Sequence, residues 1–275
     1  MKELTIITVN YNNASGLRDT IISVKNQNID TIEHVVIDGA SSDGSISILE
    51  EYTSHVKYKT EPDSGVYEAM NKGIKLAEGK FLLFLNSGDV LHDDNVLTNV
   101  LPKLKSEYAI CYGNLVFKSE SDRFVQKYPE RLSFSFFLKE SLPHPATFIQ
   151  KSLFDTLFFY SETFKIVSDW EFFICAICKE NVAYKYLDET ISIFGLDGMS
   201  NHPSNKKVIE AERKQVLQKH FPAFIEDYSD INLLETNRFK ALRALENTAV
   251  GRKLNSIWLR LMLLVYKGKT PEQLK

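Results

Sequence analysis

The stretch Leu4-Thr-Ile-Ile-Thr-Val9 is a short β-branched run, and it is followed by a helical pattern over residues 15–28 and a second such run over residues 34–38. The same alternation continues over residues 43–53, 56–60, 65–78 and 81–85. Alternating strands and helices are typical of βαβ units, whose strands lie parallel in one sheet. The first hundred residues therefore predict a mostly parallel α/β sheet with helices on its faces.

Polar clusters directly follow three of the predicted strands. They occupy residues 10–13 (Asn-Tyr-Asn-Asn), residues 38–44 (Asp-Gly-Ala-Ser-Ser-Asp-Gly) and residues 86–89 (Asn-Ser-Gly-Asp). Ligands of such sheets bind outside the carboxyl ends of the strands, where the strand order reverses. We therefore expect the three clusters to converge on one crevice.

The pattern beyond residue 105 is mixed and continues the same domain. It predicts strands over residues 108–117 and 123–128, a buried amphipathic helix over residues 168–179, and two short strands within residues 183–194, around Asp188-Glu189. These elements are expected to form the far wall of the crevice. From about residue 203 onward the pattern is mostly helical.

Composition excludes several classes of protein. The net charge of −3 and the pI near 6.1 give no reason to expect nucleic-acid binding. The longest apolar stretch, residues 257–266, contains Arg260 and is about half the roughly 20 residues that a membrane span needs. The N-terminus leads straight into a strand without a leader, so we expect a cytoplasmic protein. Cys111, Cys175 and Cys178 are expected to be reduced core thiols rather than a metal or redox site.

The sequence lacks the common nucleotide-binding motifs. No segment matches the phosphate loop GxxxxGK[ST] or the dinucleotide fingerprint GxGxxG. The sequence therefore contains no motif that supports an ordinary NTPase or dehydrogenase. A carboxylate does follow the apolar run at residues 81–85, in the turn Asn86-Ser-Gly-Asp89. Mg²⁺ typically combines one or two carboxylates with phosphate oxygens and water, so one Asp is enough here. Taken alone, this segment is also compatible with a plain turn.

Together with Asn86-Ser-Gly-Asp89, three segments resemble the family 2 inverting glycosyltransferases that assemble bacterial surface polysaccharides. They are Thr8-Val-Asn-Tyr-Asn12, Val36-Ile-Asp-Gly-Ala-Ser-Ser-Asp-Gly-Ser45 and Glu61-Pro-Asp-Ser-Gly-Val-Tyr-Glu-Ala-Met-Asn-Lys-Gly73. The resemblance covers most of residues 1–200. It implies the GT-A fold, a Rossmann-like α/β fold with a mixed, mostly parallel sheet flanked by helices.

The resemblance also implies a division into domains. A catalytic domain is expected over residues 1–202, with a nucleotide-binding half over about 1–105 and an acceptor-binding half over 106–202. A helical C-terminal extension is expected over residues 203–275.

The first half is expected to hold the nucleotide-sugar donor. By resemblance Asp89 binds a divalent ion, Mn²⁺ or Mg²⁺, as the last residue of a DXD-type motif with Asn in first place. The donor contacts implied in the same way are Thr8, Asn10, Tyr11, Asp38, Asp63, Lys72, Asn86 and Ser87. Structural alternatives remain, because Asp38 also ends its strand and Lys72 is equally a solvated helix charge. For Asp43 we favour a helix cap.

The segment Ser168-Asp169-Trp170-Glu171 resembles the one in which an Asp at a helix start removes the acceptor hydroxyl proton. We expect Asp169 to be the catalytic base, with a helix cap as the alternative. For Glu171 we favour a helix cap over the role of base. Trp170 is able to stack on a sugar ring, but aromatics at helical spacing are more often core residues, and we favour the core.

Two further segments resemble parts of the family near the acceptor. His144, followed by Pro-Ala-Thr-Phe, is either an acceptor-side residue or an ordinary loop residue. Ser200 and His202 lie where the family often has a Gly-Gly-Ile-Ser loop, although Asp197 replaces its first Gly. Imidazole tolerates several divalent ions, so His202 is a candidate for metal or diphosphate binding, but we favour a surface histidine.

The C-terminal extension is basic. From Arg238 to Lys269 there are eight Lys or Arg residues against one acid, Glu246. Apolar residues in this tail follow helical spacing: Leu254, Ile257, Trp258, Leu261, Met262 and Val265. An apolar face flanked by basic residues suits an anionic membrane surface, which we expect to be the inner face of the cell membrane. The alternative is docking on the catalytic domain or on a second subunit of a homodimer.

The expected function is therefore a glycosyltransferase. It is expected to move a hexose or N-acetylhexosamine from a nucleotide-sugar, by resemblance a UDP-sugar, to a saccharide hydroxyl with inversion. The resemblance also implies an acceptor linked to polyprenyl diphosphate, in O-antigen, capsule or exopolysaccharide synthesis. Two alternatives stay open: a nucleotidyltransferase or other sugar-nucleotide-processing enzyme, and a non-catalytic membrane-associated assembly partner with the same fold.

Overall fold

A computed structural model of the chain describes residues 2–119, 122–195, 203–224 and 236–266. Contacts divide the chain into two compact units, one up to His220 and one from Phe221 onward. Ser200 and His202, two of the predicted site residues, lie outside the described residues.

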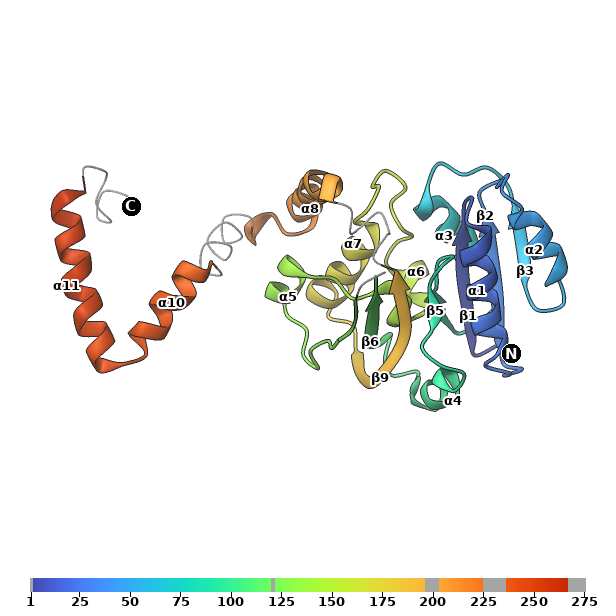
Figure 1. The fold of residues 1–275 in the computed structure, drawn as a ribbon, viewed down its shortest axis with the longest axis horizontal. Coiled ribbons are helices and arrows are strands. Elements are labelled where there is room, and N and C mark those ends of the chain that lie inside the picture. The colour runs from blue at the N-terminus through green and yellow to red at the C-terminus, as the bar shows by residue number, and fades with distance from the viewer. Residues whose placement is uncertain (1, 120–121, 196–202, 225–235, 267–275) are drawn as a thin grey trace. The chain divides into compact units, whose positions relative to one another are not determined.

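Within the described residues, nine strands form one mixed sheet, which belongs to the first unit (Figure 1). Its order is β3-β2-β1-β4-β8-β6-β9-β5, and β7 pairs with β6 outside this path. The strands are β1 (Leu4–Asn10), β2 (Ile32–Asp38), β3 (Lys57–Thr60), β4 (Phe81–Phe84), β5 (Val90–Leu91), β6 (Ile110–Lys118), β7 (Arg123–Gln126), β8 (Thr147–Gln150) and β9 (Tyr184–Gly195). The first four strands are parallel, β8 runs against β4 and β6, and β6 is parallel to β9.

Helices connect and cover these strands. The α-helices of the first unit are α1 (Ala14–Lys25), α2 (Ser45–Glu51), α3 (Val66–Leu76), α4 (Val96–Val100), α5 (Phe134–Lys139), α6 (Ser152–Thr156), α7 (Ser168–Ile174) and α8 (Lys206–His220). Short 3-10 turns are η1 (Leu101–Lys103), η2 (His144–Ala146) and η5 (Pro203–Asn205), and α7 continues into a π-helical turn, η3 (Cys175–Lys179). The second unit contains η6 (Pro222–Phe224), α10 (Asn237–Glu246) and α11 (Ala249–Val265).

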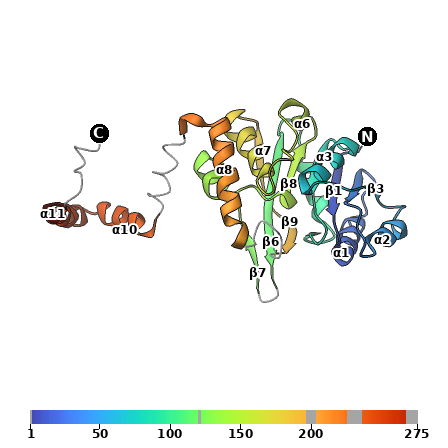
Figure 2. The same ribbon diagram turned by 90° about the horizontal axis from the view of Figure 1, so that it is seen from above.

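The central strand β1 is buried along its whole length because helices cover both faces of the sheet. Helices α1 and α2 pack on one face, around Leu17, Val36 and Leu49, and α3 packs on the other (Figure 2). On the α3 side, a Cβ on Gly73 would stand only 2.4 Å from the Ile7 side chain, so α3 lies very close to the strand. Burial on both faces is what a continuous apolar run predicts for a parallel strand. The predicted βαβ alternation is thus confirmed.

The far half of the sheet differs from the prediction in one place. Residues 183–194 were expected to form two short strands, but β9 is a single strand beside β6. The pairing of β6 with β9 shifts register around Gly113, where a Cβ would stand 2.6 Å from the Glu189 carbonyl oxygen. The polar Asp188-Glu189 pair therefore marks an irregularity within one strand rather than a turn between two.

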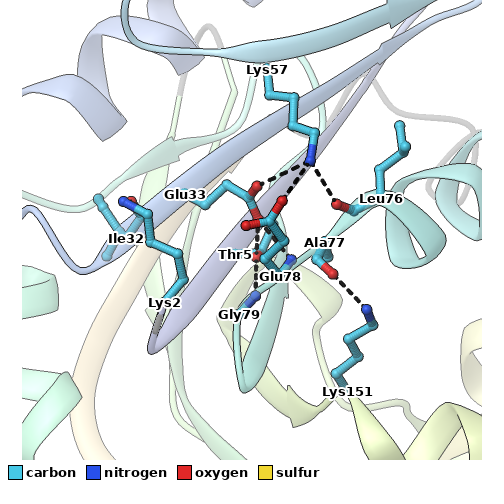
Figure 3. Close-up of polar contacts among 10 residues, drawn as sticks. All are labelled: Lys2, Thr5, Ile32, Glu33, Lys57, Leu76, Ala77, Glu78, Gly79 and Lys151. Atoms are coloured by element: carbon cyan, nitrogen blue, oxygen red, sulfur yellow. Dashed lines mark hydrogen bonds and ion pairs between the residues drawn. The ribbon is translucent and has the colours of Figure 1, made fainter.

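A polar network ties together the amino ends of the strands (Figure 3). The Glu33 carboxylate accepts hydrogen bonds from the Thr5 hydroxyl at 2.6 Å and from the Glu78 backbone N–H at 2.9 Å. Thr5 in turn accepts from the Gly79 N–H at 2.8 Å, and Lys57 forms an ion pair with Glu78 at 3.0 Å. At this end of the sheet these polar side chains bond one another, whereas the polar clusters of the sequence lie at the carboxyl ends.

Helix α8 belongs to the first unit, although the sequence placed it in the C-terminal extension that begins at residue 203. The physical reason is an ion pair that periodicity does not reveal. The fully buried Glu171 of α7 contacts Lys219 at 3.0 Å and His220 at 2.8 Å, both at the end of α8. The unit boundary therefore falls after His220.

Two expectations from composition can be compared with the structure. No helix among the described residues is long and apolar enough to cross a membrane. Cys111 and Cys175 are buried, Cys178 is partly buried, and all three are free thiols. Burial raises the pKa of Cys111 to about 12, as expected for a core thiol rather than a reactive one.

Candidate active site

The carboxyl ends of β1, β2 and β4 bring the three polar clusters to one edge of the sheet. Asn10 and Asp38 are register partners on neighbouring strands, and the loop over residues 86–89 follows β4. Asn13 joins two of the clusters, because it caps α1 and its Nδ2 donates to the Ser87 carbonyl oxygen at 2.9 Å. The predicted convergence of the clusters is therefore seen in the structure.

Asp38 is fully buried at the end of β2 and its carboxylate is held in place. Oδ1 accepts from Asn10 Nδ2 at 2.7 Å and from the Ser41 hydroxyl at 2.6 Å, and Oδ2 accepts from the Ser41 N–H at 2.9 Å. The next residue, Gly39, lies against Tyr11 and Asp63: a Cβ there would stand 2.8 Å from Asp63 Oδ2 and 3.1 Å from the Tyr11 ring. Tyr11 is 69% exposed. A flat ligand such as a nucleobase fits beside this open aromatic ring.

A cavity of about 430 Å³, which we call the first cavity, opens at the loop that follows β4, and its lining does not include Asn10, Tyr11, Asp38 or Asp63. Its polar wall includes Asn13, Asn86, Ser87 and Asp89, and Asp169 lies in its lining as well. The turn that carries Asp89 is fixed by α1, since the Thr20 hydroxyl donates to the Asp89 carbonyl oxygen at 2.7 Å. The first cavity therefore has a rigid polar wall at the end of β4.

Asp89 has the properties of a metal ligand. Its side chain is buried, and no described residue bonds its Oδ2. Burial raises the pKa of Asp89 from 3.8 to about 7, while the nearby His144 opposes the rise. Asn86 adds a second buried oxygen without a partner among the described residues, Oδ1. A carboxylate and an amide oxygen are ligands that Mg²⁺ and Mn²⁺ accept.

A metal ion at Asp89 would have few protein ligands among the described residues. The part of the chain that the structure describes holds no cluster of three His, Cys, Asp or Glu residues able to bind an ion. A divalent ion at Asp89 would accordingly need further oxygens from a ligand and from water, as Mg²⁺ commonly does with substrate phosphates. The residues present thus fit a metal that binds together with a diphosphate.

Asp169 lies at the start of α7 and is held by three groups. Its Oδ1 accepts from the Trp170 backbone N–H at 2.9 Å and lies 2.9 Å from the Tyr67 hydroxyl. Its Oδ2 lies 3.4 Å from His144 Nδ1, and His144 Nε2 lies 3.2 Å from Asn86 Nδ2. A chain of polar contacts therefore connects the Asp169 carboxylate with the Asn86 side of the first cavity.

A second cavity, of about 410 Å³, opens on the other side of Asp169. Its wall is largely apolar and aromatic and includes Tyr128, Leu142 and Trp170. Four residues line both cavities: His144, Ile166, Asp169 and Phe194. Asp169 therefore lies at the junction between two binding spaces, which is where a base between two substrates is needed.

Trp170 is buried and belongs to the wall of the second cavity. Its Nε1 donates to the Phe137 carbonyl oxygen at 2.7 Å, and the Arg213 guanidinium lies 4.8 Å from the ring centroid. With its N–H satisfied and one face covered by a cation, the indole is a fixed structural element. This placement agrees with the core role that the sequence favoured.

Other predicted residues lie outside the cavity linings. Thr8 is fully buried, where its hydroxyl bonds the Leu85 carbonyl oxygen at 2.7 Å and lies 2.8 Å from His34 Nε2. Lys72 forms ion pairs with Glu61 at 3.1 Å and Glu68 at 2.8 Å. These contacts give Thr8 a role in joining strands and direct the Lys72 ammonium to neighbouring carboxylates.

Two acidic residues near helix starts, Asp43 and Glu171, have structural roles. Asp43 accepts from the Ser45 hydroxyl at 2.6 Å and from the Ala14 N–H at 2.8 Å, which joins the beginnings of α1 and α2 and lowers its pKa. This contact resembles the predicted cap, although Gly44 is the cap residue itself. Glu171 does not cap α7, as the sequence favoured, because its buried carboxylate is bound to Lys219 and His220 of α8.

Sequence reasoning missed two contributors to the site. Tyr67 belongs to the most distinctive segment of the sequence, but nothing local indicated that its hydroxyl would reach Asp169, 102 positions away. Arg213 lies on α8, and its position against Trp170 carries no signal in the sequence pattern. Only the tertiary fold places these side chains.

The raised pKa of Asp89 leads to a prediction about stability. The ionised carboxylate opposes folding above its unfolded pKa of 3.8, and the cost grows until about pH 7, where the folded form also ionises. We predict that Asp89→Asn raises the unfolding free energy of the metal-free protein by about 2–4 kcal/mol at pH 8. Urea unfolding at pH 8 and pH 5 measures the unfolding free energy of both proteins, and the increase caused by the substitution should be smaller at pH 5. Asp94→Asn, an exposed neighbour, is the control; an equal gain at both pH values contradicts the assignment.

Comparison with known proteins identifies the family of this chain. The family described as "Glycosyl transferase family 2" matches residues 5–169. An uncharacterized glycosyltransferase of Mycobacterium tuberculosis is 30% identical over 230 residues, which are 80% of this chain and 85% of that protein. The putative teichuronic acid biosynthesis glycosyltransferase TuaG of Bacillus subtilis is 28% identical over 148 residues, or 50% of this chain and 58% of that one.

Solved structures share the fold at low sequence identity. TarS of S. aureus, residues 1–349 in complex with UDP-GlcNAc, superimposes with a TM-score of 0.61 at 18% identity, covering 89% of this chain and 80% of that one. The mannosyltransferase PcManGT of Pyrobaculum calidifontis, in complex with GDP-Man and Mn²⁺, gives a TM-score of 0.62 at 16% identity, covering 96% and 81%. Since the family match spans more than half of the chain and includes both Asp89 and Asp169, this protein belongs to glycosyltransferase family 2 and has the GT-A fold.

Proposed function

We propose that this glycosyltransferase moves a hexose or N-acetylhexosamine from a UDP-sugar to a hydroxyl group of a saccharide acceptor, with inversion at the anomeric carbon. The observation that carries the proposal is the position of Asp169 between two cavities. The first cavity has the polar wall and the unpartnered Asp89 oxygen that a sugar diphosphate with its metal requires. The second is the place for the acceptor.

In the proposed reaction, the acceptor hydroxyl lies in the second cavity within reach of Asp169. The acceptor oxygen attacks the anomeric carbon from the face opposite the diphosphate, the bond to the diphosphate breaks, and UDP leaves. Asp169 takes the hydroxyl proton. Its Oδ1 already accepts from the Trp170 N–H and faces the Tyr67 hydroxyl, whereas the contact of Oδ2 with His144 Nδ1 is longer, at 3.4 Å, so Oδ2 is the oxygen proposed to receive the proton. One displacement of this kind inverts the anomeric configuration.

The leaving diphosphate is expected on the Asp89 side. Asp89 and Asn86 would hold a Mn²⁺ or Mg²⁺ ion, which when bound neutralises charge that develops on the leaving group. The protein aligns the reactants, and alignment alone supplies a large part of the rate gain. His144 lies between the Asn86 and Asp169 side chains and orients both.

Support for UDP and for a polysaccharide product comes from the comparisons. TarS was solved with UDP-GlcNAc, and TuaG carries a teichuronic acid biosynthesis name. In this chain Tyr11 offers an exposed aromatic face just beyond β1 and Asp38 a buried carboxylate at the end of β2, although neither lines the first cavity. Lys72 is proposed to reach the diphosphate only after it leaves Glu61 and Glu68. Ser200 and His202 lie outside the described residues, and for them the proposal is a place near the substrates, as the family resemblance implies.

Metal-dependent binding of UDP tests the donor site. We predict that UDP binds in the presence of Mn²⁺ and that Asp89→Ala weakens this binding about tenfold or more, a loss of at least about 1.4 kcal/mol. Titration calorimetry of both proteins, with and without Mn²⁺, measures the effect. Asp94→Ala, an exposed neighbour of the site, should bind like the wild type.

Two other outcomes of that experiment lead to different conclusions. Binding of another nucleoside diphosphate in place of UDP would change only the donor. A protein that binds no nucleotide at all would instead fit a non-catalytic assembly partner.

The second unit supports a location at a membrane surface, facing a lipid-linked acceptor such as a polyprenyl diphosphate saccharide. Along α11, Val250, Leu254, Ile257, Leu261 and Leu264 follow one another at intervals of four and three residues and are all more than half exposed. Helix α11 also carries three basic residues and no acid. Two such helices would repel each other through these charges, whereas anionic lipid headgroups attract them. We therefore favour the cytoplasmic face of the membrane over a homodimer.

Vesicle binding tests this location. We predict that the protein sediments with phosphatidylglycerol vesicles and much less with phosphatidylcholine vesicles, and that the triple variant Leu254→Ser, Ile257→Ser, Leu261→Ser loses the binding. Val125→Ser, a half-exposed apolar residue of β7, is the matched control. Equal sedimentation of the triple variant, or concentration-dependent dimers that the triple variant abolishes, would contradict the membrane role.

A further inference from the structure

A carboxylate from α8 is buried against the segment that precedes Asp169. Glu212 is 8% exposed, and its Oε1 accepts a hydrogen bond from the Lys165 backbone N–H at 2.8 Å. Its Oε2 accepts from the N–H groups of Ile166 at 3.1 Å and Val167 at 3.3 Å. Three successive backbone donors therefore converge on one buried carboxylate, an arrangement that compensates for the loss of water around the charge. We call residues 165–167 the base loop.

The base loop is part of the wall between the two cavities. Lys165 and Ile166 line the first cavity, and Ile166 and Val167 line the second. Helix α7 begins at the next residue, Ser168, and Val167, which occupies the cap position, makes no side-chain hydrogen bond to the helix. The conformation of the base loop thus sets where α7 starts, and with it the position of Asp169.

A second connection runs from the base loop to the carboxylate itself. The Tyr67 hydroxyl lies 2.5 Å from the Ile166 carbonyl oxygen and 2.9 Å from Asp169 Oδ1. The Ile166 peptide therefore contacts Glu212 through its N–H and the phenol through its carbonyl. A shift of this peptide moves the hydroxyl that orients Asp169.

Helix α8 is anchored firmly enough to hold the base loop. At its end, Lys219 and His220 contact the buried Glu171 of α7. Val216 and Leu217 are buried in the same part of the helix. Glu212 is thus carried by an element that packs on α7 independently of the base loop.

We propose that Glu212 is a positioning residue for glycosyl transfer, which holds the base loop so that Asp169 faces the junction of the cavities. The inference rests on the proposed function, since it requires Asp169 to be the base. Nothing in the sequence around residue 212 indicates this role, because its partners lie more than 40 positions earlier.

The test compares Glu212→Gln with Glu210→Gln, an exposed residue of the same helix. Glutamine preserves the size of the side chain but turns one acceptor oxygen into an N–H₂ donor, which faces backbone donors. The rate of UDP release is measured with Mn²⁺ and the UDP-hexose or UDP-N-acetylhexosamine that the wild type cleaves fastest. We expect kcat to fall about 10- to 100-fold, since small displacements of reacting groups cost this much. The donor KM and the calorimetric affinity for UDP should stay at the wild-type values.

Amide hydrogen exchange supplies a readout that does not need turnover. The amides of residues 165–167 should exchange faster than in the wild type in Glu212→Gln and at the wild-type rate in Glu210→Gln. Glu212→Asp keeps the charge on a shorter side chain and should retain more of kcat than Glu212→Gln. If Glu212→Gln does not fold, the aspartate variant provides the same comparison of kcat with KM.

The outcomes separate this inference from the proposed function. Wild-type kcat and unchanged exchange in Glu212→Gln would overturn the inference, and so would a loss confined to KM and UDP affinity. Asp169→Asn in the same assay reports on the function itself: if it abolishes turnover while Glu212→Gln has no effect, only the positioning role fails. If Asp169→Asn turns over normally, the proposed base and the positioning role both fail.

Discussion

The proposed chemistry of this protein depends on how one carboxylate, Asp169, is held. Its partners come from three separate elements: the Tyr67 hydroxyl from α3, the Trp170 N–H from α7 and the His144 ring from η2. Helix α3 packs on the parallel strands of the nucleotide side, whereas α7 and η2 belong to the other half of the sheet. The proposed base is therefore positioned only when both halves of the first unit are folded together, and its side chain lines both cavities.

The two ends of the parallel sheet differ in how completely their polar groups are satisfied. At the amino ends, Glu33 and its partners form a closed network. At the carboxyl ends, oxygens of Asn10, Asn86 and Asp89 are buried without a partner among the described residues. Unpaired buried polar groups oppose folding, and those of Asn86 and Asp89 line the first cavity, where a ligand with its metal is proposed to complete them. The proposed active site thus lies at the carboxyl ends of the strands.

Much of the fold and part of the site could be predicted from local sequence. The run at residues 4–9 and the alternation after it predicted β1 and the parallel strands, because burial on both faces leaves a continuous apolar pattern. The position of Asp89 followed from its place after β4. The reach of Tyr67 to Asp169, and the packing of α8 on α7, could not be predicted, since these contacts join distant segments and leave no periodicity. For Lys72, the spacing predicts an ion pair with Glu68, four residues earlier, and the structure contains this pair. The sequence does not tell whether Lys72 contacts Glu68 or a bound diphosphate.

The measurement that tests the central claim most directly is a comparison of turnover and nucleotide affinity in Asp169→Asn. Asparagine preserves the shape of the side chain and cannot accept a proton as a base. The account predicts that UDP release falls by about 10²- to 10⁴-fold, the range expected for loss of a general base, while the affinity for UDP and Mn²⁺ stays unchanged. Turnover close to the wild-type rate would contradict it, and so would a parallel loss of UDP affinity, which would make Asp169 a donor ligand rather than the base.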